Sequence, residues 1–453
     1  MFRYRDDDYE QVCISGSFNG WRREPMQLDA DEGVWSIHLR LEPGRHLYQF
    51  VVEDLDETWE AIDPDNPATE RLKDRGWASV VVIDDDGDVS RREYYAGWRM
   101  DCELERKYDH KGPGVRYQRA DGLFLCFSPV HLSDGRFEPS VQGMVGYGFK
   151  SDEWSASIML LQPLAADNKW LFKAFACMQT DFTDQTGIGT NENSLAAILF
   201  KEDFRDYYRH EGAELGLIYS GLNWLRLEGG FRVGDYSSMK RNADWSISEG
   251  DFLPNPAIDP GTMRSLFAQL TLGRKLNHLD VTYEYSGEDL LGGAYEFEQL
   301  TAQYRGRLRM GSRRYLDFRV KTGTSLSGRL PIQRRYVVGG LGTVRGYEYQ
   351  SLLVPDPAIE RAPQGREMFG GERMMIANAE YVFPIRGHLD LVFFFDTGMA
   401  WEDQDASMDL DDWQSSAGIG FQLGDDALRL NLIQCLDGED RDIVVQLRIN
   451  RMF

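Results

Sequence analysis

The sequence predicts an all-β chain in which an immunoglobulin-like β-sandwich precedes an antiparallel transmembrane β-barrel of about sixteen strands. Short strand-like runs separated by turn residues fill residues 1–90, and longer segments beyond residue 100 alternate between apolar and polar residues, with almost no helical periodicity. No stretch approaches the roughly eighteen uninterrupted apolar residues of a transmembrane helix. A membrane crossing would therefore have to be made by the strands of a closed barrel.

The N-terminal part of the chain divides into short strands at glycine and asparagine. Strand-like runs lie at residues 13–21, 33–36 and 43–52. An acidic run at residues 84–88 marks the end of this region. These boundaries predict three parts, which are a sandwich at residues 1–84, a linker at residues 85–98 and a barrel at residues 99–453.

The segments after residue 100 have two chemically different faces. In residues 296–310, apolar side chains such as Leu300 and Tyr304 alternate with polar ones such as Arg305 and Arg307. A soluble sandwich shows the same alternation with its apolar face inward, so the period alone does not decide between the two folds. Runs of about ten residues with aromatic ends, and a polar face too charged for a packed core, favour a membrane barrel with a wet interior.

One segment of the predicted barrel carries a short motif. It lies within residues 335–350 and reads Val344-Arg345-Gly346-Tyr347. This motif resembles the Val-Arg-Gly-Phe/Tyr core of the signature loop in the bacterial surface antigen superfamily, which includes BamA- and TamA-like insertases and the two-partner secretion translocators. The resemblance implies an outer-membrane barrel of about sixteen strands whose loop arginine lies inside the lumen.

Five strands are expected after this loop, and the family's pattern also ends with five. The first contains Glu380 and resembles the family's strand with a lumen-facing glutamate. The second contains Asp396 within Phe-x-Asp-x-Gly, the family motif whose aspartate binds the loop arginine. The five expected strands lie at residues 373–385, 388–401, 414–424, 427–436 and 443–453.

A guanidinium inside a barrel wall needs a carboxylate partner, and a bidentate pair with Asp396 beside Glu380 would hold the loop in the lumen. Gly346 and Gly398 would let backbones approach closely. The simpler interpretation of the two acids is that they line the pore, but the three motifs occur in the family's order. We therefore expect a barrel lumen lock, which consists of Arg345, Gly346, Tyr347, Glu380, Asp396 and Gly398.

The end of the chain, residues 445–453, alternates toward a terminal aromatic residue. It looks like the C-terminal signal by which outer-membrane barrels are recognised for assembly, with Leu447, Ile449 and Phe453 as its apolar positions. Arg451 departs from the pattern, although near a strand end it could snorkel to the headgroups. By the same resemblance, the last strand would meet the first at a weak seam.

The N-terminal runs, together with residues 63–67, are similar to the family 48 carbohydrate-binding module, the glycogen-binding domain of AMP-activated kinase, over residues 8–84. That family stacks α-glucans on two tryptophans, because a pyranose ring offers an apolar face to a π-surface. The matching residues are Trp21 and Trp59, and Trp77 is a further candidate platform.

Two polar contacts of that family are missing, since Gln49 and Ala78 replace its lysine and asparagine. The module therefore either retains binding of an α-glucan or another polysaccharide, or has become a structural or protein-contacting sandwich.

An α-glucan enzyme is a further functional class, because this module usually precedes a glycoside hydrolase. Such a catalytic domain needs strands that alternate with amphipathic helices, and that pattern is almost absent here. No Asp-x-x-x-Asn-His strand end or paired-acid motif is present. We therefore predict that the protein is not an enzyme and has no catalytic residues and no cofactor.

The composition argues against one class of partner. A net charge of −24 and an isoelectric point near 4.7 disfavour nucleic acid, whose phosphates need a basic surface. The five cysteines and seven histidines are scattered without the spacing of metal ligands, so no metal site is expected from them. Acids within residues 402–412 could hold calcium, although solvated acids are the simpler interpretation.

The expected location is the bacterial outer membrane, with the sandwich in the periplasm where the superfamily carries POTRA repeats. The chain starts without an apolar signal segment, so we expect a secretory signal upstream of it. The expected partners are outer-membrane lipid, an α-glucan or other polysaccharide, and unfolded client proteins. The predicted function is protein insertion or translocation, and the alternative is a carbohydrate-binding anchor or porin without translocase activity.

Overall fold

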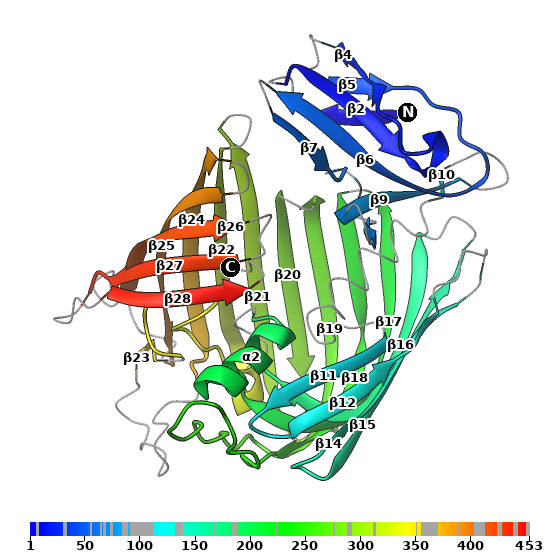
Figure 1. Ribbon diagram of the computed structural model, residues 1–453. Coiled ribbons are helices and arrows are strands. Elements are labelled where there is room, and N and C mark those ends of the chain that lie inside the picture. Colours follow the sequence, from blue (N-terminus) through cyan, green and yellow to red (C-terminus); the bar gives the residue numbers. More distant parts are fainter. Residues whose placement is uncertain are drawn as a thin grey trace.

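The computed structural model contains two β units, a sandwich and a barrel sheet (Figure 1). None of its described helices is long and apolar enough to cross a membrane. The described residues are 1–449 except 6–8, 30–33, 55–56, 64–65, 67–68, 73–75, 84–88, 91–111, 132–136, 138, 166–168, 184–187, 223, 275–276, 288–291, 311–313, 350, 355–369, 387–388, 403–412, 424–427 and 438–442.

The N-terminal unit consists of two packed sheets. Its strands are β1 (Phe2–Arg5), β2 (Gln11–Gly16), β3 (Glu24–Pro25), β4 (Gln27–Asp29), β5 (Val34–Ile37), β6 (Gly44–Asp54), β7 (Glu57–Ala61), β8 (Thr69–Leu72), β9 (Gly76–Ile83) and β10 (Val89–Ser90), with a 3₁₀ turn η1 (Ser17–Asn19). One sheet has the order β1-β5-β4, and the other has the order β10-β9-β6-β2-β3, with β7 beside β6 and β8 beside β9. Residues that alternate inward, such as Ile14, Trp35 and Phe50, form the core between the sheets.

The sandwich extends past the boundary expected at residue 84. Strand β10 pairs with β9 through Val89 opposite Ile83 and Ser90 opposite Val82. Part of the expected linker therefore belongs to the sheet.

One sheet contains all the strands from Gly112 onward, each beside the next in chain order. They are β11 (Gly112–Gln118), β12 (Gly122–Ser128), β13 (Val130–His131), β14 (Ser140–Gly148), β15 (Glu153–Pro163), β16 (Trp170–Phe182), β17 (Tyr207–Leu222), β18 (Leu225–Ser238), β19 (Gly261–Arg274), β20 (Asn277–Ser286), β21 (Phe297–Arg309), β22 (Tyr315–Gly328), β23 (Leu353–Val354), β24 (Arg373–Arg386), β25 (Leu389–Trp401), β26 (Gln414–Leu423), β27 (Leu428–Cys435) and β28 (Ile443–Ile449). Strands β13 and β23 have two residues each, so sixteen full strands remain in the described chain, and these are antiparallel. The predicted architecture is confirmed.

The barrel sheet is apolar outside and polar inside, the reverse of a soluble core. On β27, Leu428, Leu430 and Leu432 are about 40% exposed, whereas Arg429 and Asn431 between them are buried. This alternation is expected when the outer face meets lipid and the inner face meets a wet lumen. The interpretation of period two as a membrane barrel is therefore confirmed.

The five strands expected after the signature loop are observed as β24 to β28. The ends of the first four differ from the expected ones by at most one residue. The fifth begins at Ile443, as expected, and its expected end at residues 450–453 lies outside the described residues.

Helix α2 (Thr190–Phe200), in the connection between β16 and β17, differs from the sequence expectation of an almost helix-free barrel. Its buried positions are small or polar, including Asn193, Ser194 and Ala197. The polar residues of α2 lie in its first half and the apolar ones in its second half, so the sequence has no amphipathic period over the helix and the pattern did not reveal it. The chain also has a 3₁₀ turn, η2 (Ile332–Arg334).

The two rims of the barrel sheet differ in the length of their connections. At one rim, two residues separate β17 from β18, β19 from β20, and β24 from β25. At the other rim, the connections include residues 239–260 and 329–372. Figure 1 shows the sandwich beyond the rim of short connections.

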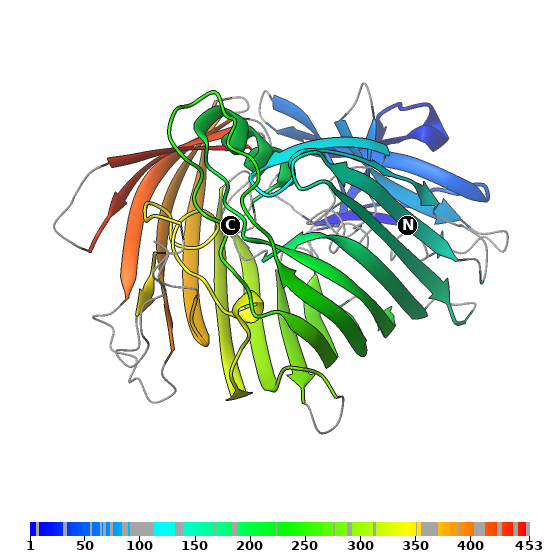
Figure 2. The ribbon, with the colours of Figure 1, turned by 90° about the horizontal axis from the view of Figure 1, so that it is seen from below.

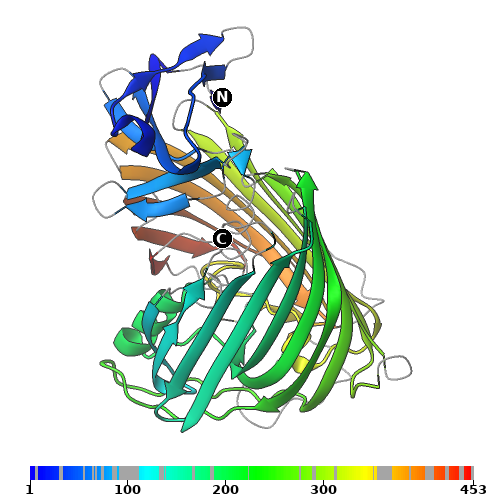
Figure 3. The same ribbon diagram turned by 90° about the vertical axis from the view of Figure 1, so that its right-hand side faces the viewer.

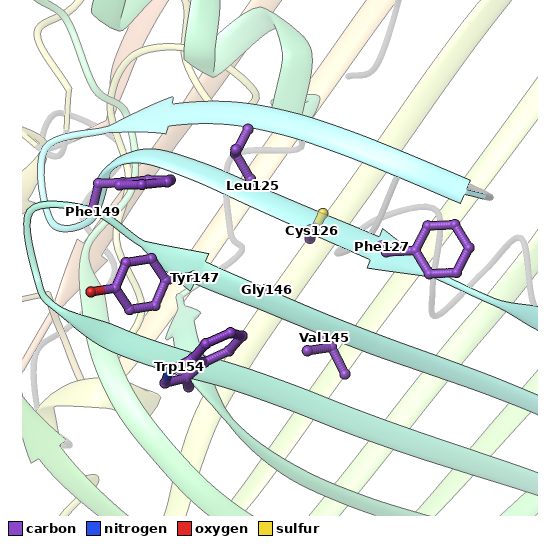
Figure 4. Close-up of a pocket in the computed structure, with 8 residues that line it drawn as sticks. All are labelled: Leu125, Cys126, Phe127, Val145, Gly146, Tyr147, Phe149 and Trp154. Carbon is purple, nitrogen blue, oxygen red and sulfur yellow. The ribbon is translucent and has the colours of Figure 1, made fainter.

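The barrel sheet is curved but not closed. Strands β11 and β28 lie at its two ends, and no pairing joins them among the described residues. The gap between them, visible in Figure 3, is the seam of this barrel.

Candidate functional site in the barrel lumen

The connection between β22 and β24 folds back against the inner face of the sheet. Its residues Tyr336, Val338 and Val344 are almost fully buried in a cluster with Met374 and Ile376 of β24. These two β24 residues share a face with Glu380, because their positions differ by even numbers along a strand. The loop therefore occupies the lumen instead of extending from the rim.

Arg345 of this loop is bound by carboxylates from two neighbouring strands. Its Nε and Nη2 donate to Oδ2 and Oδ1 of Asp396 at 2.5 and 2.7 Å, and its Nη1 donates to Oε1 of Glu380 at 2.6 Å. The exposed fractions are 6% for Arg345, 2% for Glu380 and 0% for Asp396. The Asp396 contact is the two-pronged, charge-assisted geometry that makes guanidinium–carboxylate pairs strong.

A second cation binds the glutamate of this site. Arg429 donates from Nη1 to Oε2 of Glu380 at 2.8 Å. The Arg345 guanidinium also lies 3.9 Å from the centre of the Phe394 ring. Glu380 thus lies between two guanidinium groups, and loss of one partner from such a buried group costs about 3–5 kcal/mol, because it leaves a buried charge unpaired.

Asn378 joins the aspartate to the loop backbone. Its Nδ2 donates to Oδ1 of Asp396 and to the carbonyl of Thr343, both at 2.7 Å. Its Oδ1 accepts from Nη2 of Arg319 at 2.6 Å, and the same Arg319 nitrogen donates to the carbonyl of Gly342 at 2.6 Å. Asn378 and Arg319 together therefore hold the loop at two successive carbonyls, those of Thr343 and Gly342.

The remaining residues of the expected lock bring the loop close to the strands. Gly346 has φ +90°, and a Cβ there would lie 2.8 Å from Cγ2 of Ile433 on β27. A Cβ on Gly398 would lie 2.8 Å from the carbonyl of Met375 on β24. Tyr347 donates its hydroxyl to the carbonyl of Ser415 at 2.9 Å. The structure thus brings all six expected residues to one region of the inner wall.

Sequence analysis did not identify Asn378, Arg319, Arg429 or Phe394 as parts of this site. Alternation along β24 places Asn378 on the same face as Glu380, so its inward position could be predicted. Its partner Asp396 lies directly opposite it on β25, whereas its contact with Thr343 depends on the fold of the loop and could not be predicted.

The three tryptophans proposed for sugar binding differ in their surroundings. Trp59 packs against the sandwich core, with its ring edge-on to Tyr9 at 5.4 Å between centroids. Trp77 is 52% exposed, and its carbonyl accepts from Nε2 of the buried Gln49 at 2.9 Å. Trp21 is partly buried and has φ +61°. Trp77 therefore offers the more open platform, and Gln49 supports its backbone.

The C-terminal residues are only partly described. Leu447 on β28 is 52% exposed on the outer face, and Ile449 pairs with Leu428. Phe453 and Arg451 lie outside the described residues.

No group of three or more His, Cys, Asp or Glu side chains that could hold a metal ion occurs in the described part of the chain. Most of the acidic stretch considered for calcium, residues 403–412, lies outside it. Within the described residues, the cysteines form no disulfide bond.

An antiparallel barrel with a lipid-compatible outer face and an arginine loop bound in its lumen defines an outer-membrane β-barrel protein. Residues 273–444 match the Omp85 superfamily domain, and residues 1–80 match the glycogen recognition site of AMP-activated protein kinase. Residues 273–444 are therefore assigned to an Omp85 superfamily domain, and the N-terminal 80 residues to a domain of the carbohydrate-binding type. Both resemblances seen in the sequence are confirmed.

Two curated relatives match parts of the chain. Outer membrane protein assembly factor BamA of Nitratidesulfovibrio vulgaris is 26% identical over 147 residues, which are 31% of this chain and 18% of the relative. Protein PTST homolog 2, chloroplastic, of Arabidopsis thaliana is 37% identical over 57 residues, which are 13% of this chain and 10% of the relative. The chain thus spans less than a fifth of the length of each relative.

One solved structure shows the same fold, and a second has a lower similarity. BamA from Haemophilus ducreyi lacking POTRA domains 1–3 superposes with a TM-score of 0.54 at 11% identity, covering 98% of this chain and 90% of that chain. CdiB from Acinetobacter baumannii gives a TM-score of 0.40 at 12% identity, with coverage of 75% and 58%.

Proposed function

We propose that this protein inserts or translocates polypeptides at the outer membrane. The observation that carries the proposal is the bidentate pair of Arg345 with Asp396, which ties a lumenal loop to the wall of an Omp85 barrel. A loop held in this way stiffens the C-terminal wall, since its contacts reach β24, β25, β26 and β27. The flexible part of the barrel is then the seam.

The seam offers the main-chain hydrogen-bonding edge that a client strand needs. Because β11 and β28 are not paired with each other in the described chain, β28 has an edge with backbone donors and acceptors that a sheet would normally use. An extended polypeptide can add to such an edge through main-chain hydrogen bonds, whatever its side chains are. The proposed clients are therefore unfolded polypeptides that form strands.

The test uses the full chain in lipid vesicles and a small, urea-unfolded barrel protein as the client. Client folding is followed by the fraction that migrates as a compact band on an unheated gel. We expect the wild-type chain to accelerate client folding over empty vesicles, and Arg345→Ala to lose most of this effect. Arg307→Ala, which breaks the pair with Asp317 elsewhere in the wall, is the matched control and should retain it. An equal client rate with empty vesicles would contradict the proposal.

The alternative is a carbohydrate-binding anchor or porin without translocase activity. The exposed ring of Trp77 and the match of residues 1–80 to a glycogen recognition site favour it. Its test is retention of the detergent-solubilised full chain on amylose resin, with elution by maltoheptaose. Retention without any acceleration of client folding would establish the alternative, whereas retention together with acceleration would show that both activities reside in one chain.

We further propose that the sandwich lies in the periplasm, joined to the barrel by the segment before Gly112. Its place beyond the rim of short connections supports this orientation, because outer-membrane barrels have short periplasmic turns. The protein would not be an enzyme, as is general for its superfamily. Protease added to intact cells should leave the sandwich uncut and should cleave it only after the outer membrane is permeabilised.

A further inference from the structure

Helix α2 lies in the seam of the barrel. The connection from β16 to β17 carries it across the barrel to a position between β28 and β11, far from the strands that it joins. Figures 2 and 3 show this placement from two directions. Its contacts on both sides define what it does there.

On one side, α2 is tied to the first hairpin. The backbone N–H of Tyr117 on β11 donates to Oγ of Ser194 on α2 at 3.1 Å. Asn193 on α2 donates to Oδ1 of Asp203 at 2.9 Å, and Oδ2 of Asp203 accepts the backbone N–H of Arg119, in the β11–β12 turn, at 2.8 Å. A serine side chain thus satisfies an edge donor of the first strand.

On the other side, α2 is joined to the last strand by an ion pair. Arg448 on β28 donates from Nε to Oε1 of Glu192 at 2.8 Å and from Nη2 to Oε2 at 3.4 Å. Both side chains are buried, and the residues are 256 positions apart in the chain. The pair therefore bridges the two ends of the sheet through the helix.

Like the strands beside it, the helix exposes apolar side chains and buries polar ones. Leu195, Leu199 and Phe200 are 41%, 39% and 59% exposed, whereas Asn193 and Ser194 are buried. Positions four residues apart lie on one helix face, so Leu195 and Leu199 form an outer apolar stripe. The same outer surface continues onto the strands at each side, where Val115 of β11 is 61% exposed and Val445 of β28 is 64% exposed.

We propose that α2 is a helical segment of the barrel wall, which fills the seam between β11 and β28 and faces lipid acyl chains with Leu195, Leu199 and Phe200. The continuity with the lipid-facing residues of both flanking strands identifies lipid as the occupant of this face. The seam opens between α2 and β28, because the helix stays with the first hairpin when the Arg448–Glu192 pair breaks. This inference does not rest on the proposed function, since an anchor or porin would have the same wall.

The first test measures whether α2 faces lipid. Leu195→Cys is prepared in a chain whose five native cysteines are replaced by alanine, and the protein is reconstituted in phosphatidylcholine vesicles. Val115→Cys on β11 is the lipid-facing standard, and Glu249→Cys in the exposed connection after β18 is the aqueous standard. We expect a charged, water-soluble maleimide to label Leu195→Cys as slowly as Val115→Cys, many-fold more slowly than Glu249→Cys. Labelling of Leu195→Cys as fast as the aqueous standard would overturn the proposal. Slow labelling that is seen only when the protein self-associates would overturn it too, because a second copy would then cover the helix.

The second test exchanges the two charges of the bridge. Glu192→Arg and Arg448→Glu are measured singly and together, by conductance in planar bilayers. Each single change puts like charges at the junction of α2 and β28, so we expect a several-fold rise in mean conductance, and a return toward the wild-type value in the double variant. Arg307→Glu, which puts like charges against Asp317 in the β21–β22 wall, should not raise it. Wild-type conductance in both single variants, or no recovery in the double variant, would overturn the bridge. If a single-charge variant does not insert into the bilayer, the labelling test decides whether α2 belongs to the wall, because Leu195→Cys keeps both Glu192 and Arg448.

Discussion

Arg345 and Asp396, 51 residues apart in the chain, meet inside the barrel through two parallel hydrogen bonds from one guanidinium to one carboxylate. The carboxylate is completely buried and also accepts from Asn378. It also accepts the backbone N–H of Arg345 at 3.3 Å, so side chains and the loop backbone together satisfy its charge. The stability of this wall depends on all the members of the site being present.

Arg345→Ala should destabilise the folded barrel by about 3–5 kcal/mol, because it leaves Asp396 buried without its cation. Arg345→Lys should recover little of the loss, since an ammonium cannot make the two parallel bonds. The measurement is the urea concentration at which the compact, heat-modifiable band disappears in detergent. Arg307→Ala, which breaks a less buried pair, should change it far less. Equal midpoints for the two alanine variants would contradict a special role of the lumenal pair.

Asn378→Asp should weaken the same site without changing its number of non-hydrogen atoms. The new carboxylate oxygen would replace the amide nitrogen that now donates to Asp396 and to Thr343, so two hydrogen bonds become oxygen–oxygen contacts. We expect a loss of at least about 2 kcal/mol, the usual cost of unsatisfied buried groups. Asn431→Asp is a matched control, because its amide donates over 3.2 Å to Gln446 and its oxygen still accepts from Arg429. A larger effect at Asn431 would show that Asn378 does not hold the loop.

Gly346→Ala should displace the signature loop from β27. The backbone has φ +90° there, and the added Cβ would lie 2.8 Å from Cγ2 of Ile433. Gly250→Ala separates the two causes, because Gly250 has φ +105° with no atom within 4 Å of the added Cβ. We expect backbone strain of about 1–3 kcal/mol in both variants, and an additional loss at Gly346 that Ile433→Ala partly relieves. The urea midpoint of unfolding is measured for both glycine variants. Equal losses of stability would mean that the close approach of Gly346 to Ile433 does not matter.

Trp77→Ala should affect sugar binding by the sandwich, whereas Trp59→Ala should affect its stability. The ring of Trp77 is mostly exposed, so its loss should reduce retention on amylose resin and leave the fold intact. Trp59 packs against the core and Tyr9, so its loss should destabilise the domain by about 2–3 kcal/mol, less than for a fully buried tryptophan. Limited proteolysis of the full chain reports the second effect. Retention unchanged in Trp77→Ala would exclude this ring as the sugar platform.

The barrel was predictable from the sequence because its signal is local. Residues on β24 and β27 alternate in polarity at a period of two, and this pattern gave strand ends correct to within one residue. The pair of Arg345 with Asp396 could be expected as well, because both lie in short motifs in a recognisable order. Arg429 and Arg319 could be placed on the inner face by the same alternation, but the acid or amide that each one meets could not.

The sequence by itself determined the order of the two domains and the period-two strands, since these depend on residues close together along the chain. Its short motifs pointed, by their resemblance to a known family, to Arg345, Glu380 and Asp396. The tertiary structure alone decided that α2 fills the seam and that Arg448 meets Glu192. The physical reason is that curvature of the sheet brings its first and last strands to the same place. Contacts across 256 residues leave no periodic trace in either segment.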